Sequence, residues 1–362
     1  MARIALAVFL AVISSAVAAH AQPPPVSAPC EDAAVLLTAA EQSYCFAIAQ
    51  TVESVQPQLG ILIAQGNPTI GAAGTGGLRL GTLPRISATA QIGALQLRLP
   101  DVRRRETATT ERLGLTVPAL SGTVSAGVFP GISVRPGIGG IGSVDVLGSA
   151  TWLPFNVVDT RGLASDVSEF AYGVGGRLGL LRESFIMPAA SVSVMYRRLG
   201  RVSYGDVCPA GVGADLIAGT GRGYDFVAGA CAVTGDPGEF AIDLSSWSGR
   251  AAVSKRLLGL GLAGGLGYDR YRSDVSFGVG ATATIPGIGA QPVYIRGSGL
   301  RLDQDRWSAF VSGSYTLLIT TVAAEAGWMQ GGNGLQGFDA AASGFDPRRG
   351  TLFGGLGLRV SF

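Results

Sequence analysis

Residues 351–362 of the chain, TLFGGLGLRVSF, alternate between large apolar side chains and side chains that are small or polar. The apolar set falls on one face of an extended chain: Leu352, Leu356, Leu358, Val360 and Phe362. The other face carries Thr351, Arg359 and Ser361. An alternation of period two is typical of a β-strand with one apolar and one polar face. The stretch therefore predicts a strand that ends the sequence.

The same alternation fills the chain from about residue 83 onward, and it is clearest over 168–182, 186–205 and 318–331. Strands with one apolar face have two common uses. A soluble sandwich packs the apolar faces against each other, whereas a transmembrane barrel turns them toward lipid. Composition and loop lengths decide between these two all-β architectures.

Both criteria favour the barrel. The chain is 47% hydrophobic with a mean hydropathy of +0.37, yet no window after residue 22 is a convincing membrane helix. Short connections alternate with long ones, which is the arrangement of transmembrane barrels. The short connections lie near 135–137, 181–184, 257–259 and 317–318. The long ones lie near 100–118, 154–167, 206–237, 278–303 and 332–348.

The alternation divides 83–362 into ten antiparallel strands, an even number, as single-chain bacterial barrels require. They are expected near 84–99, 119–131, 139–153, 168–182, 186–205, 238–256, 259–276, 304–317, 318–331 and 350–362. An apolar run from Pro292 to Ile295 leaves twelve strands as an alternative. Aromatic residues gather at the long-loop ends, where an interfacial girdle should lie: Trp152, Tyr172, Tyr204, Tyr268, Tyr271, Trp307 and Trp328.

An export signal precedes the strands. Arg3 supplies the positive charge, Ile4 to Val17 the apolar core, and Ala19-His20-Ala21 a small-x-small cleavage site. The predicted divisions are a signal peptide over 1–21, a Pro-rich linker and N-terminal plug segment over 22–82, and the barrel over 83–362. The expected location is the bacterial outer membrane, reached with the help of this cleaved signal.

The segment 31–56 is the one helical pattern. Its apolar residues recur at spacings of three and four and form one stripe: Leu36, Ala40, Tyr44, Ile48, Val52, Val55 and Leu59. Pro57 is expected to end or kink the helix. Because such a stripe must be buried, the segment should dock inside the barrel or against its periplasmic mouth.

The whole mature chain resembles Gram-negative outer-membrane β-barrel proteins. The carriers are the signal peptide and the final strand, whose alternating residues resemble the signal that the barrel-assembly machinery reads: Leu356, Leu358, Val360 and the terminal Phe362. The resemblance implies two partners, outer-membrane lipid and that machinery.

A narrower resemblance is to the long-chain fatty-acid transporter (FadL) family. Its carriers are the N-terminal helical segment, then Asn67-Pro68, then a Gly/Ala-rich passage that leads into the first strand. In that family an N-terminal segment plugs the lumen, an Asn-Pro-Ala motif precedes the barrel and the strands number fourteen. Here Thr69 follows Pro68. The resemblance implies a plug formed by Leu36, Ile48, Val52, Asn67 and Pro68.

The residues for most enzyme chemistry are missing. The single histidine is His20, inside the predicted signal peptide. Without it the mature chain has no Ser-His, Cys-His or Asp-His machinery and no histidine ligand for zinc. We therefore expect no enzyme activity, no metal and no cofactor. A net charge of +2 gives no footprint for nucleic acid.

The four cysteines suggest two disulfides in an exported protein. Cys30 and Cys45 belong to the N-terminal segment, whereas Cys208 and Cys231 share one long loop. If that loop is extracellular, the membrane separates the two pairs, and pairing within each segment is expected. A continuous helix would hold Cys30 and Cys45 ~22 Å apart. The chain must then reverse between them, most plausibly near Glu41-Gln42-Ser43.

Charged residues on the small-residue faces should point into the lumen. They are Arg177, Arg197, Arg201, Asp145, Asp269, Glu325 and Arg359. Either a polar path or a ladder of salt bridges accounts for them.

Three functions remain open at this point. The first is a channel or transporter for small or hydrophobic solutes, gated by the N-terminal plug. The second is a closed barrel whose long extracellular loops bind a partner, because ten strands make a narrow lumen. The third, a soluble secreted sandwich, predicts release from the cell without detergent.

Overall fold

The computed structural model describes residues 26–32, 39–64, 66–76, 78–79, 83–100, 112–133, 139–154, 170–204, 224–225, 238–285, 287–332, 346 and 348–362. The predicted signal peptide, Leu36, Cys208 and Cys231 lie outside these residues. Among the helices of the described part, none is both long and apolar enough to cross a membrane.

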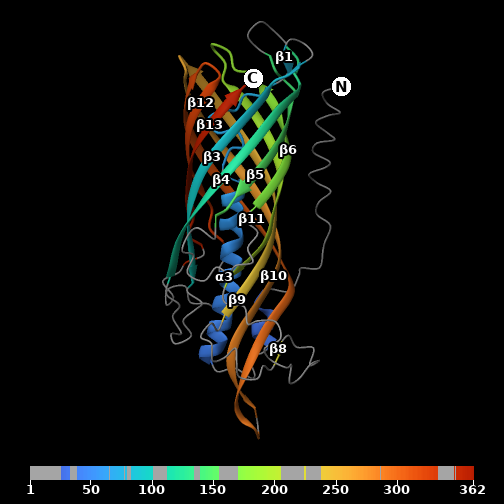
Figure 1. Ribbon diagram of the computed structural model, residues 1–362, viewed down its shortest axis with the longest axis vertical. Helices are drawn as coiled ribbons and strands as arrows, with labels where there is room; N and C mark the ends of the chain where they lie inside the picture. Colours follow the sequence, from blue (N-terminus) through green and yellow to red (C-terminus); the bar gives the residue numbers. More distant parts are fainter. Residues whose placement is uncertain are drawn as a thin grey trace.

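Ten antiparallel strands close into a barrel (Figure 1). They are β3 (Ile86–Pro100), β4 (Arg112–Phe129), β5 (Ser143–Trp152), β6 (Phe170–Leu181), β7 (Ala189–Tyr204), β9 (Gly238–Leu257), β10 (Leu260–Ile285), β11 (Gly289–Leu317), β12 (Thr320–Met329) and β13 (Thr351–Ser361). Each strand pairs with its neighbour in sequence, and β13 pairs with β3 to close the ring. The two-residue strands β1 (Leu78–Arg79) and β2 (Leu83–Pro84) pair only with each other, and β8 (Tyr224–Asp225) pairs with β11. The predicted count of ten is confirmed.

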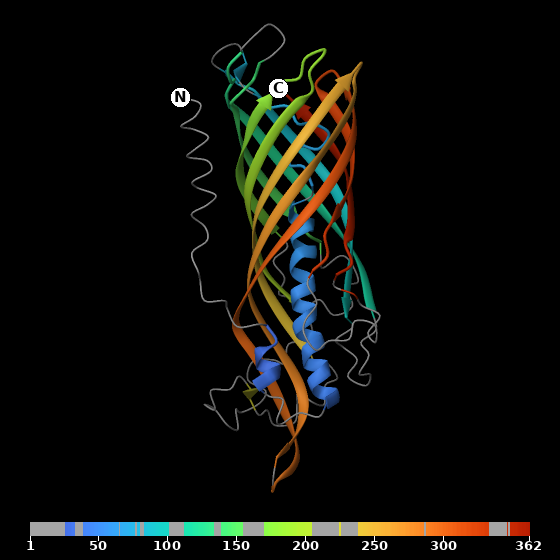
Figure 2. The same cartoon turned by 180° about the vertical axis from the view of Figure 1, so that it is seen from behind.

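The expected long loop at 278–303 is wrong. Residues 260–285 pair with residues 289–315, with one irregularity between Val275 and Phe277. The strands turn between Ile285 and Gly289, and both Gly287 and Gly289 adopt positive φ there (84° and 94°). The run from Pro292 to Ile295 therefore belongs to β11 and supplies no extra pair of strands. This hairpin extends below the rest of the barrel (Figures 1 and 2).

The outer surface divides into two bands. From the short turns to the level of Tyr268 and Trp307, the outward positions carry exposed apolar side chains such as Leu262, Leu266 and Val311. Beyond that level, the outward positions of β10 and β11 carry ion pairs: Arg270–Asp305, Arg272–Asp303 and Arg301–Asp274. Because lipid accepts apolar side chains and water accepts charges, the first band is the membrane-spanning part. We call the boundary, marked by Tyr268 and Trp307, the girdle.

The inner surface inverts at the same level. On β9, the buried inward residues from Ser246 to the short turn are mostly polar, namely Ser246, Ser248, Arg250 and Ser254. Beyond it they are apolar, namely Phe240, Ile242 and Leu244. The part beyond the girdle is thus built like a water-soluble domain, with an apolar core and a charged exterior. We call it the outer domain.

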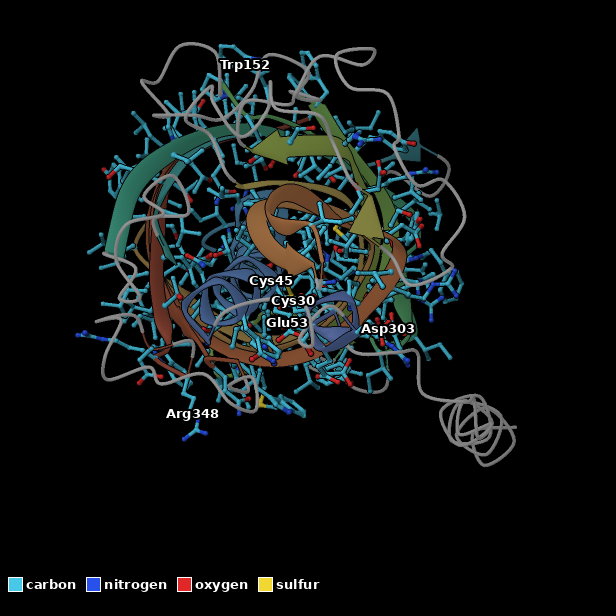
Figure 3. All side chains as sticks on the ribbon, turned by 90° about the horizontal axis from the view of Figure 1, so that it is seen from below. Cys30, Cys45, Glu53, Trp152, Asp303 and Arg348 are labelled. Atoms are coloured by element: carbon cyan, nitrogen blue, oxygen red, sulfur yellow. A yellow bond between two sulfur atoms is a disulfide. The ribbon has the colours of Figure 1, made fainter. Side chains whose placement is uncertain are left out.

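The N-terminal segment fills the barrel. Helix α2 (Ala28–Asp32) lies in the outer domain beside β11, and helix α3 (Ala39–Ala64) runs up the inside of the strands (Figures 1 and 2). Residues 66–76, here called the coil, continue without regular structure through the membrane-level lumen. Seen along the barrel, the labelled Cys30, Cys45 and Glu53 lie within the ring of strands (Figure 3).

The direction of α3 follows from two contacts with β11. The Gln56 side chain donates to the carbonyl of Leu302, and Ser314 donates to the carbonyl of Gly71. Ser314 is near the short turn that ends β11, whereas Leu302 is beyond the girdle. The chain therefore enters the barrel at the long-loop end and travels toward the short turns.

Candidate functional site

The first half of α3 packs into the apolar core of the outer domain. Ile48 and Val52 have no exposed surface, and Val55 and Leu59 are also buried. They share one cluster with strand residues such as Leu244. Of the two docking positions expected from the stripe, the segment takes the one inside the barrel.

Pro57 does not end α3, which continues to Ala64. A proline has no N–H, so the carbonyl of Glu53 loses the hydrogen bond that a helix normally gives it. The Gln304 side chain of β11 donates to that carbonyl instead, at 3.0 Å. The barrel wall thus supplies the bond that the sequence removes, and enclosure keeps the helix intact where proline would break it in water.

Glu53 lies at the level of Gln304, on the outer-domain side of the girdle. Burial raises the pKa of its carboxyl to about 7, and the nearby Arg306 opposes part of that rise. Gln56, one turn along, donates to the Ser273 hydroxyl at 2.8 Å and to the Leu302 carbonyl at 2.9 Å. The Gln56 side chain and the Glu53 carbonyl are therefore both engaged by the strands around them.

Gly60 is a notch in α3. A Cβ at this position would lie 2.0 Å from the ring of Tyr271, which is completely buried. Any other residue would push the ring or the helix aside. The ring of Tyr271, from β10, therefore packs against α3 at Gly60, where the helix has no side chain.

Charged residues of the wall hold the beginning of the coil. The Asn67 N–H donates to the Glu325 carboxylate at 3.1 Å, and the Arg250 guanidinium donates to the carbonyl of Gly66 at 2.9 Å. Arg250 also pairs with Asp269 at 2.8 Å. The Asn67 side chain serves the coil itself, because it accepts from the Thr69 N–H and donates to the Ala72 carbonyl.

A second ion pair holds the end of the coil. Arg177 pairs with Asp145 at 2.6 Å and donates to the Thr69 hydroxyl. The Asp145 carboxylate accepts from the Gly76 N–H at 2.9 Å. Four more contacts complete what we call the clamp: Arg359 to the Ile70 carbonyl, Ser314 to the Gly71 carbonyl, the Ala73 N–H to Ser254, and Thr75 to Ser143. Six strands thus bond to the coil.

Two glycines let the coil approach the wall. Gly66 and Gly71 have φ of +59° and +74°, a region that side chains disfavour. A Cβ at Gly71 would lie 2.7 Å from that of Ser314 and 2.9 Å from that of Ala323. The Gly/Ala-rich composition of the coil is therefore a packing requirement of the lumen.

The structure places six of the seven expected lumen charges inside the barrel, all of them buried: Asp145, Arg177, Arg197, Asp269, Glu325 and Arg359. Arg201 faces outward instead. The cause is an irregularity in β7 between Leu199 and Val202, which reverses the alternation and turns Val202 inward. Of these six, Asp145 pairs with Arg177 and Asp269 pairs with Arg250, and the first of these pairs also bonds to the coil.

Arg197 differs from the other lumen arginines. Its only hydrogen-bond partner among the described residues is the sulfur of Met195, at 3.1 Å, and two of its nitrogens are buried without one. The inward hydroxyls of Ser246 and Ser248, on the neighbouring strand, are also unbonded within the described part. These three inward residues are therefore polar without being bonded to the coil.

A small pocket lies beside the plug. This pocket, between Ile61 of α3 and Leu95 and Phe353 of the wall, has a volume of about 10 Å³, room for about one water molecule. Within the described residues, no three His, Cys, Asp or Glu side chains are grouped so that they could hold a metal ion.

Cys30 and Cys45 form a disulfide with a Cα–Cα distance of 5.7 Å. The helical pattern is broken as expected, into α2 and α3, but Glu41-Gln42-Ser43, where the reversal was expected, belong to α3. The expected separation by the membrane placed Cys30 and Cys45 away from the long-loop end, but their disulfide lies at that end. The pairing of Cys208 and Cys231 lies outside the described residues.

The wall residues that engage the plug had no signal in the sequence. Gln304 and Ser314 look like ordinary strand residues, and their partners are more than two hundred positions away. Tyr271 was expected in the outward girdle, but it is buried against α3. Four charged residues that hold the coil were predicted, because a charge on a small-residue face is unusual: Asp145, Arg177, Glu325 and Arg359. Arg250, which also holds the coil, was missed.

No family model matches the chain, and no curated protein matches it. Solved structures do resemble it. The translocator domain of the autotransporter NalP from Neisseria meningitidis is 12% identical, with a TM-score of 0.39 over 86% of this chain and 98% of that one. The outer membrane protease OmpT from Escherichia coli is also 12% identical, with a TM-score of 0.33 over 77% and 97%.

A mutant of the monoaromatic hydrocarbon channel TodX is 10% identical, with a TM-score of 0.26 over 77% of this chain and 89% of that one. The roles of these three proteins differ, so the likeness concerns the fold alone. The chain is a closed ten-stranded antiparallel β-barrel, and the solved structures that resemble it are outer-membrane β-barrels.

Proposed function

We propose that the protein is an outer-membrane conduit that its own N-terminal segment closes at rest. The observation that carries the proposal is the polar inner wall at membrane level, which is bonded to an extended coil. An apolar wall would suit a permanently filled lumen, because each buried polar group needs a partner. A wall of serines, arginines and carboxylates is stable both against the coil and against water, so it suits a lumen that is sometimes hydrated.

The same lining favours small polar solutes over hydrophobic ones. Arg197, Ser246 and Ser248 are inward polar residues that make no hydrogen bond to the coil among the described residues. A small hydrophilic solute would meet hydrogen-bond donors there once the coil has moved. The proposal needs no catalytic step, no metal and no cofactor, and its partners are outer-membrane lipid and the barrel-assembly machinery.

The test is conductance of the purified protein in a planar bilayer. The wild type should be closed. Gly71→Val should conduct, because its side chain has no room beside Ser314 and Ala323 and would lift the coil from the wall. Gly313→Val is the matched control, since Gly313 is the neighbour of Ser314, faces outward and has nothing within 4 Å of its added Cβ.

Conductance of the wild type equal to that of Gly71→Val would contradict closure by the coil. A folded Gly71→Val barrel without conductance would contradict the conduit itself. Heat-modifiable gel mobility shows in each case whether the barrel is folded.

A second candidate is a closed barrel that binds a partner with its external part. The observation in its favour is the outer domain, which continues far beyond the girdle on β9, β10 and β11 and has a core of its own. A silent but folded Gly71→Val barrel would favour this candidate.

A further inference from the structure

The N-terminal disulfide lies beyond the girdle, in the outer domain. We call residues 26–32 and 39–46 the knot. The Cys30–Cys45 bond joins α2 to the start of α3. Both cysteines are fully buried, and Val26 is buried beside them. All three belong to the apolar cluster of the outer domain.

The two ends of the barrel can be assigned to the two sides of the membrane. The short turns at Leu257–Leu260 and Leu317–Thr320 and the last residue, Phe362, are at one end. In outer-membrane barrels the short turns face the periplasm and the longer loops face outward. The girdle, the charged band and the knot follow in that order toward the long-loop end, so the knot lies on the outer side.

The coil joins the two sides. Residues 66–76 cross the membrane-level lumen between the knot and β3, which begins at the short-turn end. The path therefore runs from outside, through the lumen, to the periplasmic side, and only then into the first strand of the barrel.

We propose that the barrel carries its own N-terminal segment across the outer membrane and holds the knot at the cell surface. The segment is thus not a plug inserted from the periplasm. It is a surface-exposed part of the protein whose tether is the coil. Asp32 is exposed in the knot and marks the part that reaches the external solvent.

The chain allows a direct test, because its only lysine is Lys255, at the periplasmic end of β9. Intact cells that express Asp32→Lys are treated with a membrane-impermeant, amine-reactive biotin reagent. The labelled positions are then identified by peptide mass spectrometry, which separates position 32 from the α-amino group. We expect label at position 32 in intact cells and label at position 255 only after the outer membrane is permeabilised.

Two matched variants identify the side of the membrane on which each end of the barrel lies. Arg348→Lys places an amine at the long-loop end and should be labelled in intact cells, as should Asp32→Lys. Leu258→Lys places one at the fully exposed tip of the β9–β10 turn and should need permeabilisation. If Asp32→Lys follows Leu258→Lys, the proposal is wrong. If Leu258→Lys is labelled in intact cells and Arg348→Lys is not, the barrel is inverted and the proposal is equally wrong. Neither result depends on conductance, so the test is separate from that of the proposed function.

Discussion

At the scale of single residues, the pairing of Pro57 with Gln304 is the clearest case of a sequence defect repaired by the fold. Gln304→Leu leaves the Glu53 carbonyl buried without a donor, which should cost about 1–3 kcal/mol of unfolding free energy. Pro57→Ala restores the helical N–H, so Gln304→Leu should cost clearly less in that background. A double-mutant cycle from urea unfolding in detergent measures this coupling, and equal costs in both backgrounds would refute the repair. Because Gln304 also accepts from Arg306, only the coupling is diagnostic.

At the scale of the elements, the docking of α3 should depend on pH through Glu53. Its pKa is about 7 in the folded protein, against 4.5 when it is free. The folded state therefore binds the proton more tightly, and its stability falls as pH rises from 4.5 to 7 and is level above that. Compared with Glu53→Gln, whose side chain stays neutral, the wild type should lose up to roughly 3 kcal/mol across this window. A difference that stays constant between pH 4.5 and 7 would show that Glu53 is not buried on docking.

Element by element, the sequence predicted most of the strands because alternation reports directly which side chains face lipid and which face the lumen. The prediction failed where the alternation is interrupted and where the outward residues change from apolar to charged. Arg201 is on the wrong side because an irregularity in β7 shifts the period. The sequence predicts a loop where β10 and β11 extend, because beyond the girdle the outward residues become charged and no longer look like those of a membrane strand.

The site was harder to predict than the fold. Helical periodicity identified the buried stripe of α3, but a stripe has no direction, so the end at which the helix enters the barrel was not predictable. The hydrogen bonds of the clamp join residues that are far apart in the chain, such as Ala73 and Ser254. They depend on the closed ring, which no local pattern contains.

At the scale of the whole molecule, the two surface bands fix how deeply the barrel sits in the membrane. Val311 faces outward near the middle of the apolar band, so Val311→Arg should cost about 2–4 kcal/mol in lipid. Ser298 faces outward on the same strand beyond the girdle, and Ser298→Arg should change stability by less than about 0.5 kcal/mol. Unfolding titrations in lipid vesicles compare the two. Equal costs would place the membrane boundary elsewhere.

A smooth rod inside a tube can spin about its axis and slide along it. The ring of Tyr271 fills the space that a side chain at Gly60 would occupy. The ring therefore blocks both the rotation of α3 about its axis and its sliding along that axis. Neither a screw rotation nor an axial shift can release the segment while that ring is in place. Release must therefore start at the periplasmic end of the coil, bond by bond, and reach the helix last. The force needed to extract the segment should depend on the end that is pulled.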